Sequence, residues 1–149
     1  MLSIQLVYWN SVYLFHQLRK QRLNVSGLNQ VFMALVVARF QYTLPALAGQ
    51  LSADNLRKVD AVFNKARRWQ LTSHTLYSAD LIEQCDKHLF RVALNPTHCL
   101  HSILPPKKNM YGRNLRKKGH GRELPLAKTK LYKDSFVMRC IYKYVWFWL

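Results

Sequence analysis

Residues 57–69 read RKVDAVFNKARRW, and the spacing of their side chains predicts an amphipathic helix. At the helical period of about 100° per residue, one stripe about 140° wide contains the side chains of Leu56, Val59, Val62, Phe63, Ala66 and Trp69. Leu, Val, Ala and Phe are ordinary core residues, so the helix is expected to pack on this stripe and to present a positive outer face. The cationic residues of that face are Arg57, Lys58, Lys65 and Arg68.

The rest of the chain favours the same mainly α class, because no alternation of apolar and polar residues persists long enough to indicate a strand. Ser26, Ser52 and Ser78 are suited to cap three of the helices. Asn95-Pro96 is expected to start a short helical turn, since proline suits the first helical position. The expected helices cover about 4–23, 27–49, 53–70, 79–94, 96–103 and 131–144.

The segment 27–49 differs from the others because its apolar residues lie all round the helical wheel. Such a pattern is typical of a helix that is buried on every side, so we expect it to be the central helix. Pro45 is expected to kink or end it, and Gly49 to mark its C-terminal stop. Its longest unbroken apolar run, VFMALVVA at 31–38, is far shorter than the ~20 residues that span a bilayer.

The charge of the chain is strongly positive and unevenly spread. Lys and Arg number 23 against 7 Asp and Glu, for a net charge of +16. Residues 1–106 hold 11 of the basic and 5 of the acidic residues, whereas 107–149 hold 12 and 2. We therefore expect a helical region over 1–106 and a basic C-terminal tail over 107–149. In the tail, the glycines and Pro125 predict an irregular loop over 107–130, before the terminal helix.

This excess of positive charge favours a polyanionic partner, either nucleic acid or an anionic membrane surface. The three widely spaced cysteines, Cys85, Cys99 and Cys140, do not make a disulfide framework and fit a reducing compartment. The first 18 residues lack the basic start and the small-residue cleavage site of a secretory signal. An intracellular location, in the nucleus or the cytoplasm, is therefore expected.

Catalytic and metal-binding motifs are sparse. Metal-assisted nucleotidyl transfer needs clustered carboxylates, and the closest pair on one helix face, Glu83 and Asp86, is typical of a solvated surface. The chain has no phosphate-cradling GxxxxGKS/T motif and no HExxH motif. For the cysteines and histidines, the favoured interpretation is that the cysteines are small buried residues and the histidines cap helices or contact phosphate. A zinc site is the weaker alternative. Its ligands would come from Cys85, His88, His98, Cys99, His101, His120 and Cys140. We expect no catalytic residue, no cofactor and no small-molecule substrate.

Several short motifs follow one another in a distinctive order. The first half of the chain contains QLRK at 17–20, ALVVAR at 34–39, YTLPA at 42–46 and VDA at 59–61. The second half contains ALNPTHCLH at 93–101, LPPK at 104–107, GH at 119–120, LP at 124–125 and DSFVMRC at 134–140. Over roughly residues 12–145, this order resembles the segment that follows the polymerase palm in reverse transcriptases of non-LTR (LINE-type, jockey-like) retrotransposons.

The resemblance implies a helical, thumb-like bundle followed by a basic irregular loop and a terminal helix. In such enzymes the thumb lies along the template–primer duplex, and the tail is a candidate for contact with RNA or target DNA. The family's palm carries a Tyr-Ala-Asp-Asp motif with the metal-binding aspartates, and this chain has none. The expectation is a nucleic-acid-binding remnant that is not an enzyme, for which the missing polymerase palm is a possible protein partner.

The expected phosphate contacts lie on the predicted helix 53–70 and in the basic tail. They are Arg57, Lys58, Lys65, Arg68, Lys107, Lys108, Arg113, Arg116, Lys117, Lys118 and Arg122. Tyr111 and His120 have either a stacking role on unpaired bases or a plain loop role. Trp69 is expected to plug the core or to anchor the helix end rather than to serve as a base-stacking platform.

Three alternatives stay open at this point. RNA, DNA and an RNA–DNA hybrid fit the charge equally well. A cationic amphipathic protein at an anionic membrane surface is the rival class, with the aromatic C-terminal residues 142–148 at the bilayer, although a membrane partner is disfavoured. The chain could also be a non-functional genomic relic that folds only in part.

Overall fold

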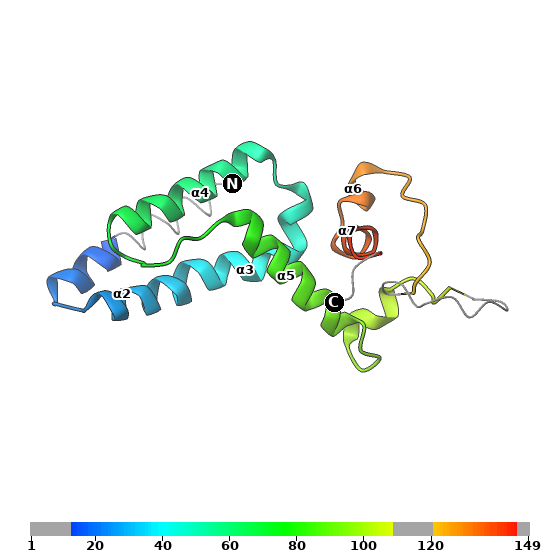
Figure 1. Cartoon of the computed structure of the whole chain (residues 1–149), viewed down its shortest axis with the longest axis horizontal. Helices are drawn as coiled ribbons and strands as arrows, with labels where there is room; N and C mark the ends of the chain where they lie inside the picture. Colours follow the sequence, from blue (N-terminus) through cyan, green and yellow to red (C-terminus); the bar gives the residue numbers. More distant parts are fainter. Residues whose placement is uncertain (1–12, 109–120, 146–149) are drawn as a thin grey trace. The chain divides into compact units, whose positions relative to one another are not determined.

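The computed structural model describes residues 13–108 and 121–145 of the 149-residue chain (Figure 1). The fold is mainly α, as predicted. Within the described residues, no strand forms and a single antiparallel bridge pairs Lys107 with Arg122. Residues 13–20 are helical. They are followed by α2 (Val25–Phe32), the π-helical turn η1 (Met33–Val37), α3 (Ala38–Leu47), the 3₁₀ turn η2 (Ala48–Gln50), α4 (Ala53–Arg68), α5 (Ser78–Ala93), the 3₁₀ turn η3 (Cys99–Ile103), α6 (Lys130–Lys133) and α7 (Phe136–Lys143).

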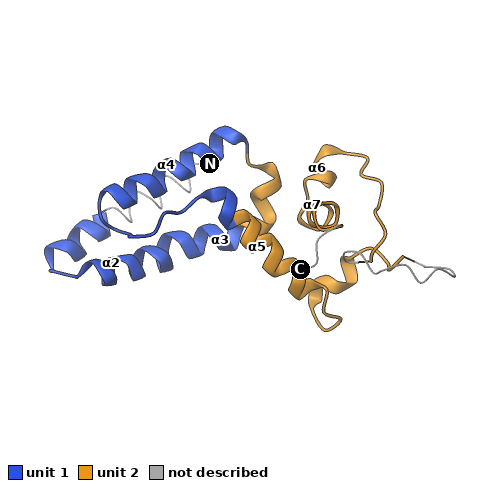
Figure 2. Ribbon diagram, viewed as in Figure 1, with its two compact units in different colours: residues 1–43, 52–81 blue, residues 44–51, 82–149 orange. Residues whose placement is uncertain are grey.

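The chain divides into two compact units (Figure 2). The described part of unit 1 is 13–43 with 52–81, and that of unit 2 is 44–51, 82–108 and 121–145. The boundary expected at 106/107 lies inside unit 2, so the change in charge there does not coincide with this division.

Unit 1 is built around the apolar face predicted for 57–69. On α4, Val59, Phe63 and Ala66 are buried, while the cationic face stays largely in solvent. Two ring contacts tie the unit together, Phe15 with Phe32 at 6.0 Å and Phe40 with Phe63 at 5.8 Å between centroids. The predicted N-cap of α4 is confirmed, since the Ser52 hydroxyl accepts a hydrogen bond from the backbone N–H of Asn55 at 3.2 Å.

The prediction that 27–49 is buried on every side is wrong. Only Leu28, Phe32, Val37 and Leu44 are buried along α2, η1 and α3, whereas Tyr42 is 88% exposed. The π-helical turn adds a residue between Phe32 and Val37 and so helps to keep the buried residues on one face. The other apolar residues of the segment are therefore left outside the core. The helical wheel alone does not distinguish such a helix, buried on one face, from a central helix that is buried on every side.

Other details of this helical stretch also differ from expectation. Asn24, and not Ser26, caps α2, because its side-chain oxygen accepts from the N–H of Gly27 at 2.7 Å. Pro45 neither ends α3 nor prevents it from reaching Leu47. By length and composition alone, the stretch Val25–Gln50 could cross a membrane, and only 17% of its apolar window is buried.

Unit 2 has its own core, which joins α5 to α7 and to the segment after η3. The buried members are Phe90, Ala93, Leu104, Cys140, Ile141 and Tyr144. The rings of Phe90 and Tyr144 stack with their centroids 5.7 Å apart. The single helix predicted over 131–144 is interrupted after Lys133, where Ser135 donates its hydroxyl to the carbonyl of Tyr132 at 2.7 Å.

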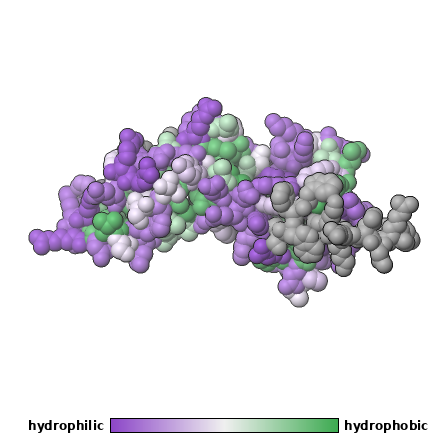
Figure 3. Space-filling model, in the orientation of Figure 1, coloured by the Kyte–Doolittle hydropathy of each residue, from purple (hydrophilic) through white to green (hydrophobic). Residues whose placement is uncertain are grey.

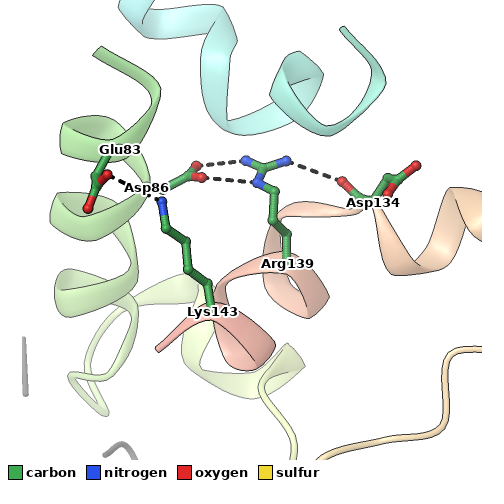
Figure 4. Close-up of polar contacts among 5 residues, drawn as sticks. All are labelled: Glu83, Asp86, Asp134, Arg139 and Lys143. Carbon is green, nitrogen blue, oxygen red and sulfur yellow. Dashed lines mark hydrogen bonds and ion pairs between the residues drawn. The ribbon is translucent and has the colours of Figure 1, made fainter. Parts of the chain in front are cut away.

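A buried ion pair links α5 to α7 (Figure 4). Asp86 is 1% exposed and accepts two hydrogen bonds from Arg139, from Nε at 3.0 Å and from a terminal nitrogen at 2.7 Å. The other terminal nitrogen of Arg139 donates to the carbonyl of Asp134 at 3.2 Å. Gly49 of η2 packs against this carbonyl so closely that a Cβ there would overlap its oxygen. Asp86 is therefore not the solvated partner of Glu83 that its spacing predicts.

Two further helix starts depart from the local pattern. Ser78 is the first residue of α5 and not its cap, and its backbone N–H is bound by the carboxylate of Asp60 on α4 at 2.7 Å. The short helix expected from Pro96 begins only at Cys99, where the ring nitrogen of His98 accepts from the N–H of Leu100 at 3.3 Å. In the first case a neighbouring helix supplies the cap, so the residues around the helix start do not reveal it.

Candidate nucleic-acid interface

The cationic face of α4 is not uniform. Arg57, Lys58 and Arg68 are exposed, and Lys65 is half-buried. Lys58 forms an exposed ion pair with Asp54, one turn away, at 2.6 Å. Arg57 and Arg68 have no such carboxylate partner among the described residues. The carboxylate of Asp54 therefore offsets the charge of Lys58, whereas Arg57 and Arg68 present their charges to solvent.

At that end, α4 meets the end of the helix formed by residues 13–20. The guanidinium of Arg19 donates to the backbone carbonyl of Trp69 and to the side-chain oxygen of Gln70, both at 3.1 Å. This contact brings together two basic runs that are separated by about fifty residues of sequence. We call this group the cationic end of unit 1; its members are Arg19, Lys20, Arg22, Lys65, Arg67 and Arg68.

Both helices stop there in the same way. In the first, the N–H of Leu23 bonds to the carbonyl of Leu18 at 3.1 Å, with Arg22 at a positive φ of 61°. In α4, the N–H of Leu71 bonds to the carbonyl of Ala66 at 3.0 Å, with Gln70 at a φ of 56°. These are Schellman-type endings, which fix the backbone beyond the last turn.

The cationic end contains no acidic side chain of its own. Residues 13–53 and 61–79 have no Asp or Glu, and Asp54 and Asp60 lie further toward the start of α4. Arg67 donates to the hydroxyl of Thr75 at 3.1 Å, a neutral partner that leaves its charge uncompensated. The negative ends of two helix dipoles partly offset the mutual repulsion of the cations. Figure 3 shows a mainly hydrophilic surface with a small apolar patch at this end of unit 1, which Figure 1 locates where α2 begins and α4 ends.

Trp69 lies in the middle of the cationic end. Its side chain is 37% exposed, so the expectation of a core plug is not met, whereas its position as the C-cap of α4 agrees with a helix-end anchor. The ammonium group of Lys65 lies over the indole, 4.6 Å from the ring centroid. An exposed aromatic ring among arginines and lysines is an arrangement that can bind both phosphates and bases.

In the tail, the described cations behave differently from one another. Lys107 and Lys108 are exposed, as a phosphate contact requires. Arg122 does not fit that role, because its side chain is 5% exposed and donates to the carbonyl of Pro105 at 2.7 Å. Burial lowers the pKa of this guanidinium. A nitrogen of Arg122 also lies 3.4 Å from each ring nitrogen of His101, so the residue belongs to the packing of unit 2.

The base of the tail is closed by backbone hydrogen bonds. The N–H of Lys108 bonds to the carbonyl of Gly121, and the N–H of Glu123 bonds to that of Pro106, both at 2.9 Å. The segment between these pairs, 109–120, lies outside the described residues. The predicted contacts and stacking residues that fall there are Arg113, Arg116, Lys117, Lys118, Tyr111 and His120.

The zinc alternative gains no support from the part of the chain that the structure describes. There, no group of three or more His, Cys, Asp or Glu side chains lies together as a metal site requires. His98 caps η3, and a ring nitrogen of His101 lies 3.2 Å from the carbonyl of Ala93. Burial, with the nearby Asp86 charge, raises the pKa of the Cys140 thiol to about 12. Such a thiol is a poor source of the thiolate that zinc binds.

A scan against protein-family models, a search of curated proteins and a search of solved structures each find no match to this chain. The resemblance to a retrotransposon reverse transcriptase therefore stays a prediction that rests on the motifs alone.

The predicted phosphate contacts do not include four members of the cationic end: Arg19, Lys20, Arg22 and Arg67. A signal for these residues was present, since a basic run ends the first helix and no acid occurs between Ala61 and Ala79. The sequence does not predict the hydrogen bond from Arg19 to the end of α4, which brings the two basic runs together.

Proposed function

We propose that this chain binds nucleic acid through its phosphate backbone and has no catalytic activity of its own. The observation that carries the proposal is the cationic end of unit 1. Six basic residues gather there, and the sequence segments around them contain no Asp or Glu. Lysine and arginine contacts to phosphate supply affinity that is largely independent of sequence. In unit 2, Lys107 and Lys108 add exposed charges at the start of the basic tail.

The proposed origin is the thumb and C-terminal region of a non-LTR reverse transcriptase. The ordered motifs and the mainly α fold support it. On this proposal the template–primer duplex or its RNA strand is the natural ligand, and a polymerase palm is a candidate protein partner. The catalytic aspartates of such a palm have no counterpart in this chain, so we expect no nucleotide incorporation.

A second candidate function follows from the helical stretch Val25–Gln50. This stretch is long and apolar enough to cross a membrane, and most of its apolar window is not buried. Exposed Leu23 and Val25 lie beside the cations of the first helix end. Basic residues next to apolar ones are typical of segments at an anionic bilayer, so a membrane-surface role competes with nucleic-acid binding.

One experiment separates these functions. The purified chain is treated with nuclease and then offered either anionic vesicles or fluorescent oligonucleotides over a series of salt concentrations. Nucleic-acid binding predicts tight oligonucleotide binding that weakens linearly with the logarithm of salt, together with little flotation with vesicles. Efficient flotation without measurable oligonucleotide binding would reject the first function in favour of the second.

A further inference from the structure

Trp69 supplies an exposed aromatic ring at the cationic end of unit 1. At 37% exposure, part of the indole is in contact with solvent. Its neighbours in sequence, Arg67 and Arg68, and its neighbour in space, Arg19, are all cationic. A ring in this setting can stack on a nucleobase while the surrounding charges contact the phosphates on either side.

The backbone at Trp69 is held from several directions. Its N–H bonds to the carbonyl of Lys65 at 3.0 Å, and its carbonyl accepts from Arg19 at 3.1 Å. Beyond it, Gln70 and the buried Leu71 close the end of α4 through bonds to Arg67 and Ala66. The attachment point of the ring is therefore fixed before any ligand arrives, which reduces the ordering that binding requires.

The contact with Lys65 shows that a group can lie over the ring. The ammonium stands 4.6 Å from the ring centroid, a cation–π geometry. At exposed sites this interaction is weaker than the stacking of a base on an aromatic side chain. A base can therefore displace the ammonium, which then has a phosphate of the same strand as its new partner.

We propose that Trp69 is a stacking platform for an unpaired base, so that the cationic end recognises single-stranded nucleic acid. The inference rests on the proposed nucleic-acid function and goes beyond it, because phosphate contacts alone do not distinguish single strands from duplexes. In this arrangement Arg68 and Lys65 contact the phosphates next to the stacked base. Bases within a duplex are stacked on one another and do not offer a face to the indole.

The test uses three ligands of equal length: an oligothymidylate, the same backbone with abasic sites in place of the bases, and a duplex. For the unmodified protein, oligothymidylate should bind more tightly than the abasic strand. Trp69→Ala should weaken oligothymidylate binding by roughly tenfold, within the range known for base–aromatic stacking. The same variant should leave abasic and duplex binding, and all the salt slopes, unchanged.

Two variants serve as controls. Trp69→Phe keeps an aromatic face and should retain most of the affinity for oligothymidylate. Tyr42→Ala removes the most exposed aromatic side chain of α3, 88% exposed, and should have no effect on any ligand. Because duplex binding is measured on each variant, a general loss of folding would be recognised as a loss for all three ligands.

The outcomes are separable. Equal binding of oligothymidylate by Trp69→Ala and the unmodified protein would overturn the stacking proposal and leave phosphate binding intact. Equal losses on the oligothymidylate and the abasic strand would also overturn it, since the ring would then act through the fold. Failure of the unmodified protein to bind any of the three ligands would overturn both this inference and the proposed function.

Discussion

Asp86 illustrates at the scale of one residue how a charge can hold unit 2 together. It is buried, and both of its oxygens accept from Arg139 (Figure 4). Glu83, three residues earlier on the same helix, is exposed and stands 3.7 Å from Lys143. The sequence spacing places these two acids on one helix face but does not reveal which of them is buried, because the basic partners lie fifty or more residues away.

The first prediction compares these two acids. Asp86→Ala should lower the free energy of unfolding by about 3–5 kcal/mol, because it leaves the partly buried Arg139 without its partner. Glu83→Ala should lower it by no more than about 1 kcal/mol, as expected for an exposed pair. Urea unfolding followed by circular dichroism measures both values. Equal losses for the two variants would show that the buried pair has no special role.

The second prediction concerns Cys140. Its pKa is raised to about 12, first by burial and then by the charge of Asp86, from a value of 9.0 when unperturbed. The unfolded chain therefore loses this proton at lower pH than the folded chain. Stability is fully retained below about pH 9 and is lost as the pH rises toward the folded pKa.

We expect Cys140→Ala to flatten the fall in unfolding free energy between about pH 9 and pH 11 relative to the unmodified protein. Cys99→Ala, which changes an exposed thiol, is the matched control and should leave the slope as it is. Denaturant titrations at each pH give the comparison. Identical slopes in all three proteins would contradict the assignment of a buried, protonated thiol at position 140.

At the scale of the helices, the structure separates what local sequence determines from what it does not. Ser52 caps α4 through a bond to Asn55 in the same helix, and this was predictable. The start of α5 was misassigned, because the carboxylate that binds the N–H of Ser78 comes from Asp60. The break between α6 and α7 also depends on a contact between residues, and the sequence did not predict it. The break places the carbonyl of Asp134 where the side chain of Arg139 donates a hydrogen bond to it.

The third prediction tests the cap that α4 supplies to α5. Asp60→Ala should lower the free energy of unfolding by about 1.5–3 kcal/mol, because it leaves the buried N–H of Ser78 without a charged acceptor. Asp54→Ala removes another carboxylate of α4, one that is paired only with exposed Lys58, and should cost about 1 kcal/mol or less. Thermal melts of the two variants provide the measurement. A larger loss at Asp54 would refute the role given to Asp60.

At the scale of the molecule, the helical periodicity of the sequence predicted the fold class, whereas the net charge favours a polyanionic partner but does not show where on the molecule the charge gathers. The amphipathic helix 57–69 was recognised from its period, and α4 follows it closely. The cationic end of unit 1 was not, because it depends on the contact of Arg19 with the end of α4. The prediction that 27–49 is a central helix was wrong, because an apolar segment of that composition can be buried on one side only.

The central claim is that nucleic acid binds at the cationic end, and charge-matched variants test it most directly. One variant replaces Lys20, Arg22 and Arg68 with Ala, side chains with no ion-pair partner among the described residues. The control replaces Lys87, Arg91 and Lys133, which are exposed residues of unit 2. Each variant removes three positive charges, so a general effect of net charge is the same in both.

The measurement is the slope of the logarithm of the duplex-binding constant against the logarithm of salt concentration. We expect the first variant to flatten this slope by roughly 0.9 for each phosphate that the protein no longer neutralises, while the control keeps the slope of the unmodified protein. Equal flattening by both variants, or by neither, would contradict the assignment of the cationic end as the nucleic-acid interface.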